Sequence, residues 1–362
     1  MCYAQHVVIP PATSWSGRHL SRVVIGPTLW ALVALGGACR YSGPVSVFIS
    51  PGAATAKPGD VTQLRAAASQ TLDAAVTWSV KEGDRGGTVS STGLYTAPNS
   101  PGVYHVVASS RLDPAWSATA AIHVGLRGCE RTGPTGLQSK TIEANGKQRR
   151  YLLFVPPRSA SSGPLAVVFF FHGLGGDGAD SRAMAGLEAH SAGSAIFVYP
   201  DGIRGGWDLR DGGDDMRLFD RILESLMEDY CVDMSRIFAA GFSYGGVMSN
   251  MLGCYRGQSV RAIASAAGAL IPAVPICRGH VAAWNTFGVK DNDYKDYAEH
   301  IRDFWLAQNN CGVSGTPVSP APCEAYSCPV EGFDVVWCRH ERGHEWPAFA
   351  SEAVWSFFDG FR

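Results

Sequence analysis

The pattern of hydrophobic and polar positions changes character near residue 125. Between residues 44 and 125, short apolar runs recur at close spacing, and clusters of Gly, Pro, Asp and Ser separate them. This pattern is typical of an all-β sandwich. The predicted strands are Val45–Ile49, Ala75–Val80, Val103–Ala108 and Thr119–Val124.

From residue 128 to residue 362, strand-like and helix-like segments alternate. Leu165–Phe171 is apolar at every position, as expected of a strand that is buried on both faces. Met216–Asp229 carries one apolar stripe at helical spacing, and Arg236–Ala240 predicts a strand followed by a helix over Tyr244–Leu252. Further strands are predicted at Tyr151–Val155, Ala195–Tyr199, Val281–Phe287 and Val335–Cys338. The alternation predicts a mostly parallel sheet with crossover helices.

The N-terminus carries the features of an export signal. Basic residues within Arg18–Arg22 precede the apolar run Val23–Leu35, and small residues then lead to Cys39. This order is that of a secretory signal peptide over residues 1–39, and the run is shorter than the about 20 residues of a membrane span. The stretch before Cys39 also resembles a bacterial lipobox, although a glycine stands where leucine is usual. Free secretion and a lipid anchor at Cys39 both remain open.

The cysteine content favours a disulfide-bonded, exported protein, and the charge disfavours a nucleic-acid-binding protein. Eight of the ten cysteines follow residue 128, and an even set in an exported chain indicates disulfides. We expect the pairs Cys311–Cys338 and Cys323–Cys328, and the other pairings remain open. The absence of CxxC pairs in the sequence disfavours a zinc site. The net charge of −2 gives no electrostatic argument for a nucleic-acid partner, and no basic cluster favours binding to a membrane surface.

The segment GFSYGG, residues 241–246, is the strongest chemical signal. It matches G-x-S-x-G and lies between a predicted strand and a predicted helix, which is the context of a nucleophile elbow. Such a turn is tight and strained, so glycines on either side avoid collisions with neighbouring backbone. We therefore predict Ser243 as a nucleophile.

A serine nucleophile needs a base and an acid. His344 follows a predicted strand and is the expected base; His340 lies closer to the strand and lacks a preceding glycine. Asp291 follows another predicted strand and is the expected acid, with Asp293 as the alternative. The chain order of serine, aspartate and histidine is that of the α/β-hydrolase fold.

The segment HGLGG, residues 172–176, follows the buried strand and predicts an oxyanion loop. We expect the backbone N–H groups of Leu174 and Tyr244 to bind the developing oxyanion. One such donor is typically worth about 10²–10³ in rate. His172, Trp207 and Trp346 are expected to contact substrate, the tryptophans as aromatic walls, although either tryptophan equally fits a core position.

Several motifs together resemble the polyhydroxybutyrate depolymerase and feruloyl esterase-like family of secreted serine esterases. They span nearly all of residues 129–362: HGLGG, YPDG (199–202) with Trp207, Asp214 with Asp215, CVDMSRIFAAGFSYGG (231–246) and GHEWP (343–347). The resemblance implies an α/β-hydrolase fold, with Ser243 as nucleophile, Asp291 as acid and His344 as base. Phe287 departs from the family, which usually has histidine there. Tyr244 stands where Asn or Gln is frequent.

The segment TWSVKEGDRGGTVSSTGLYTAP, residues 77–98, resembles bacterial Ig-like domains of exported proteins, which often serve as spacers or adhesion modules. The sequence thus predicts a secreted carboxylic ester hydrolase that needs neither metal nor cofactor. Its expected substrates are polymer-linked esters, first feruloyl or acetyl esters of plant xylan and next a polyester such as polyhydroxybutyrate. The alternative from another class is a catalytically inactive surface protein that binds carbohydrate or mediates adhesion.

Overall fold

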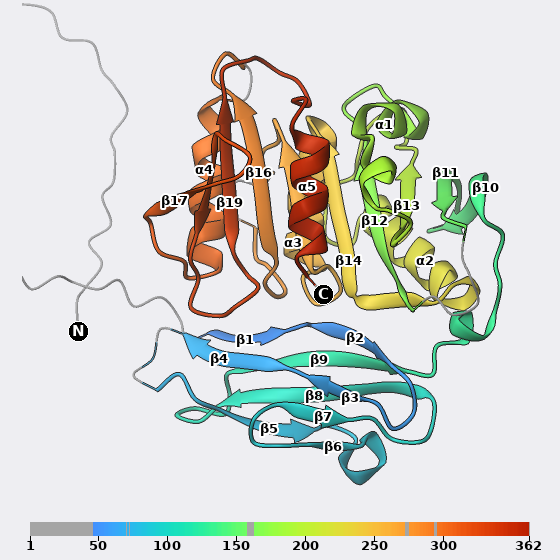
Figure 1. The fold of residues 1–362 in the computed structure, drawn as a ribbon, viewed down its shortest axis with the longest axis vertical. Helices are drawn as coiled ribbons and strands as arrows, with labels where there is room; N and C mark the ends of the chain where they lie inside the picture. The colour runs from blue at the N-terminus through green and yellow to red at the C-terminus, as the bar shows by residue number, and fades with distance from the viewer. Residues whose placement is uncertain are drawn as a thin grey trace, which may run out of the picture. The chain divides into compact units, whose positions relative to one another are not determined.

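The fold was obtained as a computed structural model that describes residues 46–69, 71, 73–157, 163–271, 275–292 and 295–361 (Figure 1). The predicted signal peptide with Cys39, and the alternative acid Asp293, lie outside the described residues. No helix in these ranges is both long and apolar enough to cross a membrane.

The N-terminal part of the described chain consists of strands. They are β1 (Ser46–Ser50), β2 (Ala53–Ala56), β3 (Val61–Gln63), β4 (Arg65–Ser69), β5 (Val76–Val80), β6 (Thr88–Val89), β7 (Leu94–Thr96), β8 (Gly102–Ser110) and β9 (Ser117–Val124). They form a two-stranded sheet β1-β4, a three-stranded sheet β3-β7-β6 and a four-stranded sheet β2-β9-β8-β5. Their shared core includes Leu64, Tyr95, Val106 and Ile122. The strands expected from the sequence are present, and kinship with bacterial Ig-like domains stays a prediction.

The C-terminal part is built on one ten-stranded mixed sheet. Its strands are β10 (Gly136–Ala144), β11 (Lys147–Val155), β12 (Leu165–Phe171), β13 (Ala195–Pro200), β14 (Val232–Phe242), β15 (Ala262–Ala266), β16 (Ala282–Gly288), β17 (Gly315–Val318), β18 (Cys323–Tyr326) and β19 (Val335–His340). The sheet order is β10-β11-β13-β12-β14-β15-β16-β19-β18-β17. Strands β13 to β19 of this order pair in parallel, and antiparallel pairing adds two strands at each edge.

Helices cover both faces of this sheet. They are α1 (Gly178–Ala185), α2 (Asp214–Asp229), α3 (Tyr244–Tyr255), α4 (Lys295–Gln308) and α5 (Ala350–Asp359), with short 3-10 helices η1 (Gly83–Gly86), η2 (Arg127–Glu130) and η3 (Leu187–His190). One core cluster joins α2, α3 and α4 to the sheet, and a second joins α1, η3 and α5 to the opposite face. Alternate residues of β12 enter the two clusters, which explains why every position of Leu165–Phe171 is apolar.

The first strands of the N-terminal part contact the C-terminal part directly. The Thr55 hydroxyl in β2 donates to the carbonyl of Val232 (2.8 Å) and accepts from the N–H of Met234 (3.0 Å), both in β14. The ring of Phe48 in β1 stacks on His280, with 3.8 Å between ring centroids, and is only 1% exposed. These contacts bury apolar surface and satisfy backbone groups, so the N-terminal β-sandwich is packed against the C-terminal part.

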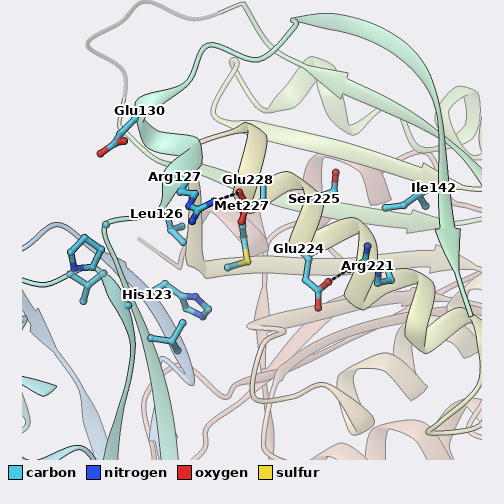
Figure 2. Close-up of a pocket in the computed structure, with 15 residues that line it drawn as sticks. His123, Leu126, Arg127, Glu130, Ile142, Arg221, Glu224, Ser225, Met227 and Glu228 are labelled. Atoms are coloured by element: carbon cyan, nitrogen blue, oxygen red, sulfur yellow. Dashed lines mark hydrogen bonds and ion pairs between the residues drawn. The ribbon is translucent and has the colours of Figure 1, made fainter. Parts of the chain in front are cut away.

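A pocket of about 990 Å³ lies where β8 begins and β9 ends, near η2 and α2 (Figure 2). Its wall from η2 and α2 carries two ion pairs, Arg127 with Glu228 and Arg221 with Glu224. None of the residues that line this pocket was predicted from the sequence to act in catalysis or substrate binding.

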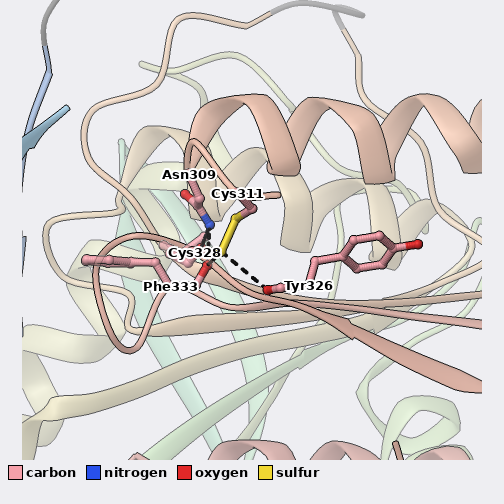
Figure 3. The surroundings of a disulfide bond; sticks show 6 residues. Asn309, Cys311, Tyr326, Cys328 and Phe333 are labelled. Atoms are coloured by element: carbon pink, nitrogen blue, oxygen red, sulfur yellow. Dashed lines mark hydrogen bonds between the residues drawn. A yellow bond between two sulfur atoms is a disulfide. The ribbon is translucent and has the colours of Figure 1, made fainter. Parts of the chain in front are cut away.

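Four disulfides correct the pairings expected from the sequence. They are Cys129–Cys231, Cys254–Cys277, Cys311–Cys328 and Cys323–Cys338. The expected pairs Cys311–Cys338 and Cys323–Cys328 are wrong because β18 and β19 are antiparallel neighbours whose register places Cys323 opposite Cys338. Cys311, just after α4, then reaches Cys328, beside the side-chain amide of Asn309 (Figure 3). Four disulfides are consistent with an extracellular, oxidising location.

Candidate active site

Ser243 lies in the sharp turn between β14 and α3. Its φ of 55° and ψ of −121° are unusual for a residue with a side chain, and such backbone strain persists only where the surroundings enforce it. A side chain at Gly241 would collide with the carbonyl of Gly245, and one at Gly245 would collide with the carbonyl of Phe171. The two glycines thus let β14, α3 and the end of β12 approach closely around the serine.

His344 and Asp291 complete a hydrogen-bonded chain that begins at Ser243. The Ser243 Oγ lies 2.8 Å from His344 Nε2, and His344 Nδ1 lies 2.7 Å from Asp291 Oδ2. A carboxylate only accepts, so Nδ1 carries the hydrogen and Nε2 is left to accept the serine proton. Asp291 is 2% exposed, whereas the imidazole faces solvent in part. This arrangement can deprotonate the serine and stabilise the imidazolium that forms.

The acid and base loops are joined by backbone hydrogen bonds. Because β16 and β19 are parallel neighbours, both loops leave the same edge of the sheet. The N–H of Val289 donates to the backbone carbonyl of His340 (2.9 Å), and the N–H of Lys290 donates to the backbone carbonyl of Arg342 (2.9 Å). Gly288 permits this approach, since a side chain there would collide with the Arg342 carbonyl.

His340, the competing histidine, lies elsewhere. Its side chain is buried at the end of β19, its Nδ1 accepts from the N–H of Arg342 (3.3 Å), and burial lowers its pKa. Of the two histidines weighed from the sequence, the structure brings His344 to Ser243.

The HGLGG loop, predicted to bind the oxyanion, lies beside the serine. A Cβ built on Gly173 would come within 3.4 Å of Ser243 Cβ. The side chain of Leu174 is 75% exposed, and Tyr244 is the first residue of α3, where the helix dipole gives partial positive charge. A Cβ on Gly206 would lie 3.8 Å from Leu174 Cδ1 and 3.6 Å from Tyr244 Cε1. The loop around Gly206 therefore forms a further wall beside Leu174 and Tyr244. This wall was not predicted from the sequence, where its only signal is the glycines that follow YPDG.

His172 and Trp207, which were predicted to contact substrate, are buried and hydrogen-bonded within the protein. His172 is 1% exposed, and both ring nitrogens are engaged by backbone groups of Gly173 (2.7 Å) and Gly202 (2.9 Å). Trp207 is 5% exposed and donates its indole N–H to the His172 carbonyl (2.9 Å). Both side chains thus lie beneath the loop. Trp346 is half-buried, contacts Phe170 edge-on at 5.0 Å between ring centroids, and donates to Ser351.

Asp214 and Asp215, the adjacent aspartates of the family motif, have different hydrogen-bond and ion-pair partners. Asp215 is buried, accepts from Arg149 (2.5 Å) and from the N–H of Asp208 (2.6 Å), and so ties the segment after Trp207 to β11. Burial raises the pKa of Asp215, against the opposing effect of the Arg149 charge. Asp214 instead pairs with Lys147 near the surface. Within the described ranges, no group of three or more His, Cys, Asp or Glu residues is placed to hold a metal ion.

Comparison with known proteins identifies the family. Feruloyl esterase D of Neurospora crassa is 31% identical over 266 residues, which cover 65% of this chain and 90% of the relative. Feruloyl esterase C of Emericella nidulans is 30% identical and covers 67% of this chain and 95% of the relative. The solved structure of acetyl xylan esterase from Aspergillus awamori shares the fold, with a TM-score of 0.54 at 16% identity, over 63% of this chain and 100% of that one. No family model matches the chain. The chain belongs to the feruloyl esterase family and is a carboxylic ester hydrolase with the α/β-hydrolase fold.

Proposed function

We propose that this protein is a secreted serine esterase that hydrolyses polymer-linked esters, most specifically feruloyl or acetyl esters of plant xylan. The observation that carries the proposal is the hydrogen-bonded chain from Asp291 through His344 to Ser243. The substrate class is supported by relatives named as feruloyl esterases and by a structural neighbour named as an acetyl xylan esterase.

In the proposed reaction, Ser243 Oγ attacks the ester carbonyl carbon while His344 Nε2 takes the hydroxyl proton. The carbonyl oxygen becomes an oxyanion that accepts hydrogen bonds from the N–H groups of Leu174 and Tyr244. The bond to the alcohol oxygen then breaks, and His344 gives its proton to that oxygen. An acyl group stays on Ser243.

Water completes the cycle. His344 removes a proton from a water molecule whose oxygen attacks the acyl carbon, and the Ser243 Oγ leaves with the proton returned by His344. The carboxylic acid is released and the serine is regenerated. Throughout, Asp291 keeps the imidazole in the required tautomer and balances its positive charge.

A substrate panel tests both the reaction and its substrate. Methyl ferulate, acetylated xylan and polyhydroxybutyrate would be compared with purified mature protein and with Ser243→Ala. We expect hydrolysis of methyl ferulate or acetylated xylan, with a loss of at least about 10³-fold in Ser243→Ala. Full activity in that variant would refute the nucleophile, and preference for polyhydroxybutyrate would refute the xylan-ester assignment.

Export is also part of the proposal. The predicted signal peptide and the four disulfides support an extracellular location, either free or anchored through Cys39. The mass of the mature N-terminal peptide, with or without acyl chains on Cys39, decides between these two forms.

A further inference from the structure

We propose that His172, Trp207 and Tyr244 form a hydrogen-bonded clamp that holds the two oxyanion donors, Leu174 and Tyr244, in register with each other. The side chains of the clamp do not touch the reacting atoms in this proposal, so they are positioning groups. The inference rests on the proposed function, because it assigns the orientation of the amides that this function uses.

The first half of the clamp fixes the peptide group between Gly173 and Leu174. The carbonyl oxygen of Gly173 accepts from His172 Nδ1 (2.7 Å) and from the N–H of Gly176 (3.1 Å). In a trans peptide the C=O and the N–H point in opposite directions. Holding the Gly173 carbonyl therefore sets the direction of the Leu174 N–H, and Gly173 itself lies against Ser243.

The protonation of His172 is defined by its two partners. The Gly173 carbonyl only accepts, so Nδ1 must carry the hydrogen. The N–H of Gly202 only donates, so Nε2 must be the acceptor at 2.9 Å. Burial lowers the pKa of His172, against the opposing effect of Asp201 and two further carboxylates, Asp177 and Asp180. The ring is thus a neutral bridge between two loops at the sheet edge.

The second half of the clamp reaches the residue after the nucleophile. The Tyr244 hydroxyl donates to the backbone carbonyl of Trp207 (2.9 Å), and the Trp207 indole N–H donates to the carbonyl of His172 (2.9 Å). The rings of Trp207 and His172 are in contact, with 4.4 Å between centroids. Tyr244 is therefore held at both ends: its backbone begins α3, and its hydroxyl is tied to the loop that supports His172.

These bonds join the elbow to the oxyanion loop through side chains. The two donors lie on separate segments, the first turn of α3 and the loop after β12. The side-chain bonds hold these two segments together. An oxyanion site works because its donors are already oriented before charge develops. The long tyrosine side chain at position 244 lets its hydroxyl reach the Trp207 carbonyl.

Tyr244→Phe is the most direct test, since it removes the hydroxyl while keeping the ring and the backbone N–H. Complete loss of one oxyanion donor costs about 10²–10³-fold, so a loosened donor should lower kcat about tenfold with KM nearly unchanged. The inhibition constant of phenylboronic acid, which forms a tetrahedral adduct on serine, should rise by a similar factor. Tyr230→Phe is the matched control, because its hydroxyl also donates to a backbone carbonyl, that of Pro134 (3.0 Å), away from the elbow.

A second pair of variants tests the histidine. His172→Asn keeps an amide N–H donor near the position of Nδ1, whereas His172→Leu removes every polar atom of similar size. The clamp predicts that kcat is higher in His172→Asn than in His172→Leu. A purely structural role predicts that both variants change thermal stability without separating kcat from KM.

The outcomes separate the two proposals. Activity in Ser243→Ala would overturn the proposed function and the clamp together. An inactive Ser243→Ala, combined with unchanged kcat and unchanged boronic acid inhibition in Tyr244→Phe, would overturn the clamp alone. A tenfold loss shared by Tyr244→Phe and Tyr230→Phe would also overturn it, since the effect would then not be specific to the elbow.

Discussion

Replacing Phe48 by alanine should destabilise the catalytic part of the molecule, although Phe48 belongs to the sandwich. Its ring is 1% exposed and packs against His280, Val330 and Phe333 of the hydrolase part, with Ala67 of β4 beside them. Truncating a buried phenylalanine to alanine typically costs about 3–5 kcal/mol, partly as lost burial and partly as the cavity left behind. Because Phe48 packs on residues beyond β1, this cost falls on the contact between the two parts.

The assay is thermal inactivation of esterase activity, recorded beside calorimetry of the same samples. For domains of 150–250 residues, 1 kcal/mol shifts Tm by about 2–4 °C, so Phe48→Ala should lower the inactivation midpoint by roughly 10 °C. Val103→Ala, in β8 and 48% exposed, is the control and should change stability by less than about 0.5 kcal/mol.

Thr55→Val probes the polar part of the same contact at nearly constant shape. It leaves the Val232 carbonyl and the Met234 N–H without the hydroxyl that now serves both. An unsatisfied buried polar group costs about 1–3 kcal/mol, so this variant should also lower the inactivation midpoint. Two separate calorimetric transitions in the wild type, with the catalytic midpoint unmoved in both variants, would refute the packed arrangement.

Three further predictions concern the site and its support. Asp291→Asn should lower kcat by about 10⁴-fold with little change in KM, because the imidazole loses its preferred tautomer; steady-state kinetics against wild type measures this. Asp215→Asn should cost about 3–5 kcal/mol in urea unfolding, because it leaves the buried Arg149 charge without its counter-ion. Burial lowers the pKa of His123 and of His280 to about 4, so the unfolded state binds more protons between about pH 6.5 and 4. Stability should be constant above that window and fall within it by about 1.4 kcal/mol per pH unit for each histidine, and His280→Gln should flatten the unfolding profile.

The strands that are buried on both faces were the easiest elements to predict. β12 coincides with the predicted Leu165–Phe171, because all seven positions enter one core or the other. By contrast, β15 (Ala262–Ala266) is built mainly of alanines and was not predicted, since its strand state comes from pairing between β14 and β16. The disulfide partners failed for the same reason: the register of β18 on β19 is a tertiary property.

The site shows the same division. Ser243 and its glycines were predictable because the elbow is a local motif whose strain demands them. His172 and Trp207 are buried in the structure, and their contact with substrate stays a prediction. A sequence gives the residue type but not its exposure, and here the hydrogen-bond partners of both side chains lie inside the protein.

Strand β14 links the stability of the molecule to its chemistry. Its first residues, Val232 to Met234, contact Thr55 of the sandwich, and its last residue precedes Ser243. Opposite β12, Val232 pairs with Leu165 and Gly241 with Phe171, so at about 3.3 Å per residue these ends lie roughly 20 Å apart, too far for the sandwich to touch the reacting atoms. The sandwich should therefore affect the temperature at which the catalytic part unfolds, and not the kcat of the folded enzyme. At temperatures below the unfolding transition of each variant, Phe48→Ala should retain wild-type kcat, whereas Tyr244→Phe should lower kcat. A lowered kcat in Phe48→Ala, or an unchanged kcat in Tyr244→Phe, would contradict this assignment of the two ends of β14.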